Sequence, residues 1–263
     1  MTAAETEWAL ALFRKSVLKQ AKLRHILDLL HDPTGKRNLD IGADNGVISY
    51  LLRQRGGHWA SADLDPRAVA SIRQLVTTDV YQLDGARLPF PDRAFDQVVV
   101  VDYLEHIEDD RRFAGELARV LVPGGRAVVN APHLQPGSPL NRFRHWIGLT
   151  DEWHGHLRPG YTVQSLTDTL GPRFRIEGAV TYSRFGSELV DTMLNGVYEL
   201  MQRRKGGAAS LKGSVVTQTD VHRYRRQFRV LSLLYPALRL TAAADALLPW
   251  QPGHKLILAA TLT

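Results

Sequence analysis

The chain has 263 residues, of which 44% are hydrophobic and 23% charged, with a formal net charge of +6 and no cysteine. This length suffices for one large α/β domain, and the composition excludes an intrinsically disordered chain. The absence of cysteine excludes a disulfide framework, a thiolate metal site and a cysteine nucleophile. The positive charge suits anionic partners but is also common in enzymes that bind none.

The amino-terminal segment predicts a helical cap over residues 1–32. Hydrophobic residues recur at helical spacing from residue 3 to residue 30, and the turn at 32–35 (DPTG) ends the pattern. Charged residues interrupt this segment, so we predict no signal peptide, and no stretch of the chain approaches a membrane-spanning length. We therefore expect a cytoplasmic protein.

Short apolar runs then alternate with helical stretches, which is typical of a parallel sheet with crossover helices. The predicted strands lie near 37–41, 58–63, 77–82, 95–101 and 125–130. The predicted helices lie near 46–55, 66–74 and 109–121, and the Pro-Gly-Gly turn at 123–125 introduces the fifth strand.

Beyond residue 130 the composition changes. Residues 131–161 are rich in loop-forming and aromatic residues and are expected to be a loop beside the substrate. A helix near 162–170, a strand near 173–181 and a final strand at 255–261 follow, and residues 183–253 look like a largely helical insertion.

The segment 38–46 (NLDIGADNG) places an acid at the end of a strand and a glycine turn before a helix. Gly42 allows close approach of the backbone, and Gly46 lets the helix begin beside the strand with its N–H groups directed outward. Because a carboxylate repels a pyrophosphate and attracts an ammonium group, Asp40 favours a ligand with a cationic amino-acid end.

This segment resembles the first motif of the class I S-adenosylmethionine-dependent methyltransferases, in which an acid is followed by three glycines at alternate positions. Asp44 stands at the position of the middle glycine, after Ala43. The resemblance implies that this loop binds the methionine part of S-adenosylmethionine. Asp44, which replaces the middle glycine of the pattern, would add a second carboxylate facing the ammonium group of the methionine part.

Further elements of the same family follow in its order between residues 37 and 130. The resemblance implies that Asp63, before Leu64 at the end of the second strand, accepts hydrogen bonds from the ribose hydroxyls. It also implies that Asp84 accepts from the adenine amino group and that the Gly85 amide addresses the ring. The stretch 95–106 (FDQVVVVDYLEH) is similar to the fourth strand and its exit loop, which adds two cofactor-binding candidates, Asp102 and Tyr103.

The resemblance implies a doubly wound, Rossmann-like and mostly parallel sheet of about seven strands with an antiparallel edge. We predict a single domain with a cofactor-binding core at 36–182, a helical insertion or lid at 183–253, and the last strand at 254–263. The activity expected is transfer of the methyl group of S-adenosyl-L-methionine to an O, N or C atom of a small molecule. A natural product, a quinone, a lipid or a glycan all remain open as acceptor.

Histidines supply the catalytic candidates, because their pKa suits proton transfer near neutrality. His106 follows the fourth strand and His133 the fifth, and either could serve as a base for a hydroxyl acceptor. His154 and His156 resemble a metal pair. However, alternate residues of an extended segment point to opposite sides, and no acid or cysteine joins them at ligand spacing, so we predict no metal site.

Basic amphipathic residues at 222–250 leave two interpretations of the insertion, a lid over the site or a peripheral membrane contact. The first suits a soluble metabolite and the second a lipid or lipid-linked acceptor.

The fourth strand is not followed by a motif of the kind that binds a flipped base, so we expect no nucleic-acid partner. A non-catalytic binding protein remains the alternative function. A nicotinamide oxidoreductase is disfavoured, because the spacing of Gly42 and Gly46 does not fit its glycine motif.

Overall fold

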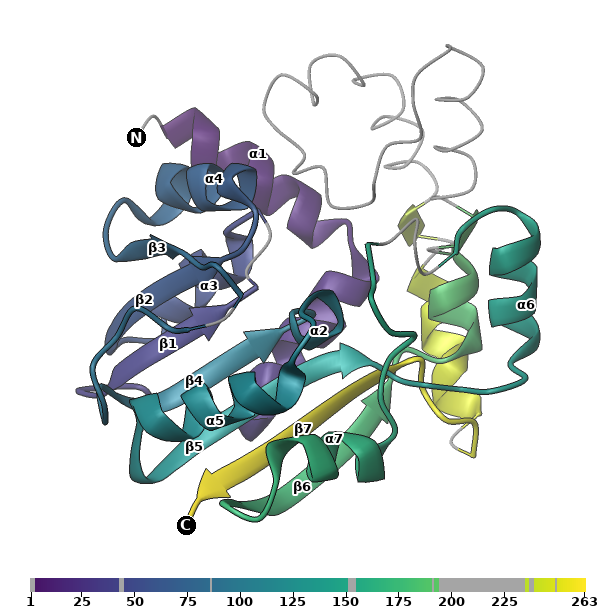
Figure 1. The fold of residues 1–263 in the computed structure, drawn as a ribbon. Coiled ribbons are helices and arrows are strands. Elements are labelled where there is room, and N and C mark those ends of the chain that lie inside the picture. Colours follow the sequence, from purple (N-terminus) through teal and green to yellow (C-terminus); the bar gives the residue numbers. More distant parts are fainter. Residues whose placement is uncertain are drawn as a thin grey trace.

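The computed structural model describes residues 3–42, 45–85, 87–150, 155–190, 192–193, 235–236, 239–248 and 250–263. Seven strands form one sheet in the order β3-β2-β1-β4-β5-β7-β6 (Figure 1). The strands are β1 (Arg37–Ile41), β2 (His58–Asp63), β3 (Val80–Gln82), β4 (Phe95–Val101), β5 (Leu121–Pro132), β6 (Phe174–Tyr182) and β7 (Lys255–Leu262). β7 runs antiparallel to both of its neighbours, whereas the pairs from β3 to β5 are parallel. The predicted Rossmann-like sheet with an antiparallel edge is confirmed.

Helices cover both faces of this sheet. They are α1 (Ala3–Arg14), α2 (Val17–Leu29), α3 (Val47–Arg53), α4 (Pro66–Val76), α5 (Asp110–Val120), α6 (Pro139–Trp146) and α7 (Val163–Leu170), with short 3-10 helices η1 (Leu104–His106) and η3 (Asp245–Leu247). Along β4, Val98 and Val100 join the core beneath α5 and α7, whereas Val99 and Val101 join the core beneath α2 and α3. This alternation follows from the two-residue period of a strand and explains the uninterrupted valine run.

The amino-terminal cap differs from the prediction, because one long helix is replaced by two. Ser16 lies between α1 and α2 with extended backbone, and its side chain accepts a hydrogen bond from the Lys19 amide. A serine that caps the start of one helix in this way separates it from the helix before it. α2 then packs on the sheet through the fully buried Ile26.

Three other boundaries were predicted wrongly. β3 begins at Val80, not at residue 77, because Thr77 and Asp79 have left-handed backbone with φ of 61° and 56°. β5 extends from Leu121 through the Pro-Gly-Gly segment, where its register with β4 shifts. The expected loop 131–161 contains a helix, α6, which begins after the capping side chain of Ser138 with proline at its first position.

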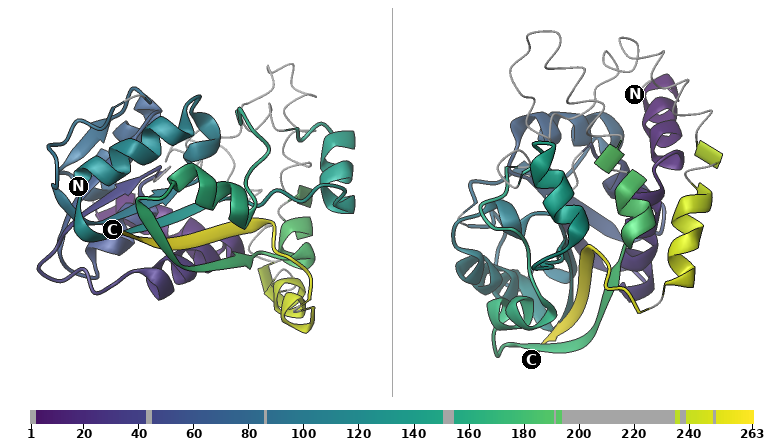
Figure 2. Two further views of the ribbon diagram at one scale, coloured as in Figure 1. Left: turned by 60° about the horizontal axis from the view of Figure 1, so that its bottom comes forward. Right: turned by 90° about the vertical axis from the view of Figure 1, so that its right-hand side faces the viewer.

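The predicted insertion at 183–253 lies largely outside the described residues. Within the described parts, residues 185–190 and 239–244 are helical. Figure 2 shows the first of these next to α6, and the two helices are joined by an ion pair between Arg144 and Glu188. The described helices include none with both the length and the apolar character needed to cross a bilayer. The predicted division at residues 182 and 254 stays a prediction.

Candidate functional site

The loop after β1 is shaped by two glycines with left-handed backbone. Gly42 has φ of 81°, and a Cβ atom on it would lie 2.1 Å from the carbonyl oxygen of Val101 at the end of β4. A Cβ on Gly46 would lie 2.8 Å from the Cα of Ile72 in α4. Both glycines are therefore needed to bring neighbouring elements together. Ala43 and Asp44, between them, lie outside the described residues.

Asp40 is almost fully buried at the end of β1, and both of its carboxylate oxygens are already engaged by the protein. Ser49 in α3 donates a hydrogen bond to Oδ2 (2.5 Å), and Ser61 in β2 donates to Oδ1 (2.8 Å). Arg53 Nη1 lies 3.6 Å from Oδ1. Burial raises the pKa of Asp40, while Arg53 and the two serines oppose that shift. These contacts join β1 to α3 and β2, where the sequence had suggested contact with a ligand's ammonium group.

The ends of β2, β3 and β4 converge on a second set of predicted residues. A Cβ atom on Gly85 would lie 3.5 Å from Cδ2 of Leu64 and 3.8 Å from Cγ2 of Ile107. Gly85 has φ of 82°, which favours glycine. Leu64 and Ile107 thus flank the backbone of Gly85, as expected of a slot for a flat ring. Ile107 was not predicted from the sequence.

Tyr103 is the residue through which this set is related to two predicted acids, Asp63 and Asp84. It is 2% exposed, and its hydroxyl has no hydrogen-bond partner among the described residues. Burial raises the pKa of Tyr103, and the negative charges of Asp63 and Asp84 raise it further. The two carboxyl groups therefore lie close enough to the Tyr103 hydroxyl to act on it through space. Each also accepts a local backbone hydrogen bond, Asp63 from the Asp65 amide (3.1 Å) and Asp84 from the Arg87 amide (3.1 Å).

Asp102 follows β4 with left-handed backbone, φ 43°, which is rare for a residue other than glycine. Lys22 of α2 forms an ion pair with Oδ2, and Lys255 of β7 lies 3.9 Å from Oδ1. Asn130 Nδ2 donates to Oδ1 at 2.7 Å. Burial favours the neutral acid, but the two ammonium groups outweigh it and lower the pKa of Asp102. Neither lysine was predicted as a site residue, because both are distant from Asp102 in the sequence.

The two predicted catalytic histidines lie in different surroundings. His106 Nδ1 donates to the carbonyl oxygen of Gly155 (2.9 Å), and His133 Nδ1 donates to that of Gly253 (2.7 Å). A carbonyl can only accept, so each Nδ1 carries the proton and each Nε2 keeps its lone pair when the ring is neutral. His133 therefore belongs with the segment before β7, while His106 belongs with residues 155–157.

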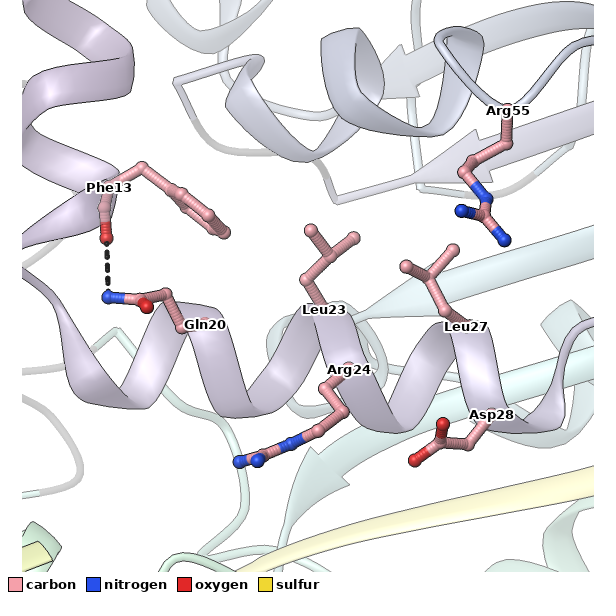
Figure 3. Close-up of a pocket in the computed structure, with 7 residues that line it drawn as sticks. All are labelled: Phe13, Gln20, Leu23, Arg24, Leu27, Asp28 and Arg55. Atoms are coloured by element: carbon pink, nitrogen blue, oxygen red, sulfur yellow. Dashed lines mark hydrogen bonds between the residues drawn. The ribbon is translucent and has the colours of Figure 1, made fainter.

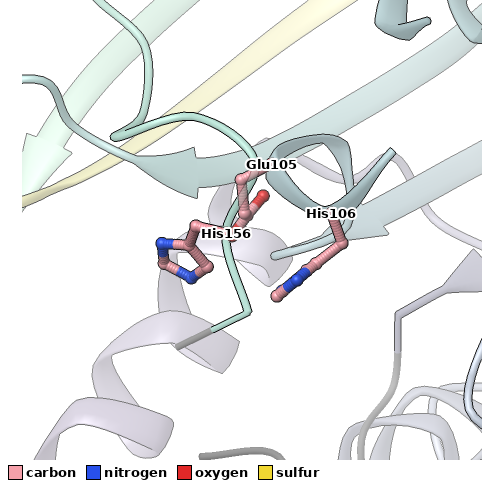
Figure 4. A group of neighbouring side chains, drawn as sticks. All are labelled: Glu105, His106 and His156. Carbon is pink, nitrogen blue, oxygen red and sulfur yellow. The ribbon is translucent and has the colours of Figure 1, made fainter. Parts of the chain in front are cut away.

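His106 lies in a group that the sequence analysis did not foresee. The ligand atoms of Glu105, His106 and His156 lie within 4.8 Å of one another (Figure 4). Glu105 is fully buried, and neither carboxylate oxygen has a hydrogen-bond partner in the described part of the chain. The prediction of no metal site rested on the absence of an acid or cysteine at ligand spacing from His154 and His156 along the chain. It considered neighbours in sequence only, and His154 lies outside the described residues.

A separate hollow of about 490 Å³ lies along α2, between Phe13 of α1 and Arg55 (Figure 3). Its lining residues are Phe13, Gln20, Leu23, Arg24, Leu27, Asp28 and Arg55. None of them is a predicted site residue, and none comes from the loops that follow β1, β2 and β4. The candidate site is therefore defined by the strand ends and not by this hollow.

A family model described as a methyltransferase domain matches residues 39–129, the part of the chain that holds β1 to β5. A demethylmenaquinone methyltransferase from Thermus thermophilus is 34% identical over 113 residues, which cover 40% of this chain and 51% of that relative. These matches support a class I S-adenosylmethionine-dependent methyltransferase domain over residues 39–129. S-adenosyl-L-methionine, the methyl donor of this family, is therefore the expected cofactor.

Other methyltransferase relatives extend the match. The 2-methyl-6-phytyl-1,4-hydroquinone methyltransferase of Synechocystis is 28% identical over 184 residues, covering 66% of this chain and 57% of that relative. The chain spans about half the length of the Thermus methyltransferase that it matches. Among solved structures, the [4+2]-cyclase SpnF has a TM-score of 0.60 at 18% identity, covering 93% of this chain and 80% of that protein. This last likeness concerns the fold alone.

Proposed function

We propose that this chain transfers the methyl group of S-adenosylmethionine to a small-molecule acceptor. The observation that carries the proposal is the convergence of Asp63, Asp84, Leu64, Gly85 and Tyr103 at the ends of β2, β3 and β4. In open α/β sheets, ligands bind at the carboxyl ends of the strands. Two acids beside an apolar slot match the polar edges and flat faces of a nucleoside.

The donor site is assigned residue by residue. Asp63 accepts hydrogen bonds from the ribose hydroxyls, and Asp84 accepts from the adenine amino group, while the Gly85 amide addresses the ring. Leu64 contacts one face of the adenine, and Tyr103 completes the pocket. Gly42 and Gly46 shape the loop for the methionine part, together with Ala43 and Asp44. Asp40 acts as a positioning residue, because its oxygens are bound by Ser49 and Ser61.

The acceptor proposed is an aromatic diol of the hydroquinone class. The names of two relatives, which act on demethylmenaquinone and on a phytyl hydroquinone, support this choice. In the reaction the bond between sulfur and methyl breaks as the acceptor atom bonds to the methyl carbon, and the acceptor loses one proton. Positioning alone can lower such a barrier by about 7–11 kcal/mol. His106 or His133 accepts the proton at Nε2.

The phytyl group in the name of one relative is a long apolar tail, and such a tail suits the predicted lid or peripheral membrane contact at 222–250. Residues 222–234 lie outside the described part. Leu240, Leu247 and Trp250, which follow them, each expose more than two thirds of their surface. Their exposure supports contact of this region with an apolar group, either the acceptor over the site or a lipid surface.

The alternative is a protein that binds the cofactor without transferring its methyl group. The similarity to a [4+2]-cyclase supports keeping it, since this fold also serves other reactions. Asp44 in place of the middle glycine of the motif is the second reason.

The test uses S-adenosylmethionine with an isotopically labelled methyl group. The protein is incubated with a reduced 1,4-hydroquinone and, separately, with a metabolite extract, and products are read by mass spectrometry. We expect a labelled methylated product, lost in Asp63→Asn and retained in Asp168→Asn, whose carboxyl is exposed on α7. A labelled product from the extract alone would reject the hydroquinone class. Cofactor binding without any labelled product would support the non-catalytic alternative.

A further inference from the structure

The group formed by Glu105, His106 and His156 has the composition of a metal site. Two imidazole nitrogens and one carboxylate are the ligands that divalent zinc, iron, cobalt and manganese accept in proteins. The three ligand atoms lie within 4.8 Å of one another. The ligands of a tetrahedral zinc ion stand about 3.4 Å apart at bond lengths of ~2.1 Å, so side-chain rotations that bring these atoms closer together would close the site.

Glu105 supplies an independent sign that the group receives a cation. Its side chain is fully buried, and neither carboxylate oxygen has a hydrogen-bond partner within the described ranges. A buried carboxylate without hydrogen bonds is destabilising, and a bound cation is one of the few neighbours that satisfies both oxygens.

His106 is oriented as a metal ligand would be. Its Nδ1 donates to the Gly155 carbonyl at 2.9 Å, which directs the lone pair to Nε2. Metal-binding histidines almost always donate their second ring N–H to a carbonyl or carboxylate in this manner. The geometry therefore fixes the tautomer before any ion arrives.

His156 is held beside η1 by hydrogen bonds from the two residues that follow it. The Leu157 amide donates to the backbone carbonyl of Glu105 at 2.8 Å, and the Arg158 guanidinium donates to the carbonyl oxygen of Ile107 (2.8 Å). Arg158 is also paired with Asp110 at the start of α5. Figure 4 shows Glu105 and His106 on one segment and His156 on the other, so these backbone contacts position the ligands of both segments.

We propose that Glu105, His106 and His156 form a mononuclear site for a divalent transition-metal ion, adjacent to the methyl-donor site. Tyr103 and Ile107, which flank these ligands in sequence, both belong to the proposed cofactor pocket. Three protein ligands leave further positions for water or for an oxygen of the acceptor. This inference goes beyond the proposed methyl transfer and assigns the Nε2 of His106 to the ion, which leaves His133 as the proton acceptor.

The test measures metal binding by the full chain, free of any histidine tag and stripped with a chelator. Co²⁺ is titrated while its visible absorption is followed, and Zn²⁺ is then used to displace it, in the absence of S-adenosylmethionine. We expect one ion per chain. Glu105→Gln, His106→Ala and His156→Ala should each weaken binding by at least about 100-fold, beyond the 10–100-fold typical of changes outside the ligand shell.

His58→Ala is the matched control, because His58 is exposed at the opposite, amino-terminal end of β2. Its affinity should equal that of the unmodified chain, and circular dichroism reports whether each variant is folded. Should Glu105→Gln fail to fold, the two histidine variants still decide the question. Absence of stoichiometric binding, or equal affinity of the folded histidine variants and His58→Ala, would overturn the proposal. Because no cofactor is present, neither result depends on methyl transfer.

Discussion

At the scale of single residues, Gly42 and Gly137 separate two reasons for glycine. Both have φ of 81°, but a Cβ on Gly42 would collide with the Val101 carbonyl at 2.1 Å, whereas one on Gly137 would meet nothing within 4 Å. Alanine at either position adopts a strained backbone, and only at Gly42 does it also force β1 and β4 apart.

We therefore expect Gly137→Ala to lower the free energy of unfolding by about 1–2 kcal/mol and Gly42→Ala to lower it by about 3 kcal/mol or more. Urea unfolding followed by circular dichroism measures both. Equal losses in the two variants would show that the collision at Val101 is relieved at no cost.

Tyr103 and Tyr161 form a second informative pair. The Tyr161 hydroxyl donates to Asp110 Oδ2 at 2.8 Å, whereas the Tyr103 hydroxyl has no partner in the part of the chain that the structure describes. Removing a hydroxyl that is buried without a partner relieves a desolvation cost, and removing one that is bonded breaks an interaction.

Tyr103→Phe should accordingly raise the free energy of unfolding of the ligand-free protein by about 1 kcal/mol, and Tyr161→Phe should lower it by about 1–3 kcal/mol. Thermal unfolding without cofactor tests the opposite signs. A loss of stability in Tyr103→Phe would mean that the Tyr103 hydroxyl has a hydrogen-bond partner in the ligand-free protein. It would contradict a proposed pocket in which this hydroxyl is free to meet the cofactor.

At the scale of elements, α6 and the helical residues 185–190 are joined by one buried ion pair. Arg144 of α6 pairs with Glu188, whose Oε1 also accepts a hydrogen bond from Ser183 at 2.6 Å. Burial alone would raise the pKa of Glu188, but Arg144 and Lys255 outweigh it and lower the pKa. The carboxylate form is thus more stable in the folded chain than in the unfolded one.

Arg144→Met leaves this buried carboxylate without its main partner and should lower the free energy of unfolding by about 3–5 kcal/mol at pH 7. Because the folded-state pKa is depressed, the stabilisation exists above the unfolded pKa of about 4.3 and is lost as pH falls below it. The deficit of Arg144→Met should therefore narrow towards pH 3.

Arg142→Met, which removes an exposed arginine from the same helix, controls for the loss of positive charge. Urea unfolding across pH 3–7 provides the comparison. A deficit that stays constant over this range, or an equal deficit in Arg142→Met, would contradict the assigned role of the ion pair.

At the scale of the whole molecule, the sequence predicts what is encoded locally. Apolar runs that end at an acid are local signals, and they located β1, β2 and β4 correctly. The helix α6 was missed because its capping serine and first-turn proline lie in a stretch whose composition is typical of a loop. Lys22, Lys255 and His156 could not be predicted, since only folding brings them to Asp102 and Glu105. The bonds from Ser49 and Ser61 to Asp40 likewise arise from packing between elements.

The most direct test of the account is calorimetric titration of the folded protein with S-adenosylhomocysteine, the product of methyl transfer. Hydrogen bonds to a charged group contribute about 1.5–3 kcal/mol, so Asp63→Asn and Asp84→Asn should each weaken binding by about 10–100-fold, while Asp168→Asn binds as the unmodified chain does. Absence of binding by the folded, unmodified protein, or equal affinities in all four proteins, would contradict the proposed nucleoside pocket at the ends of β2, β3 and β4.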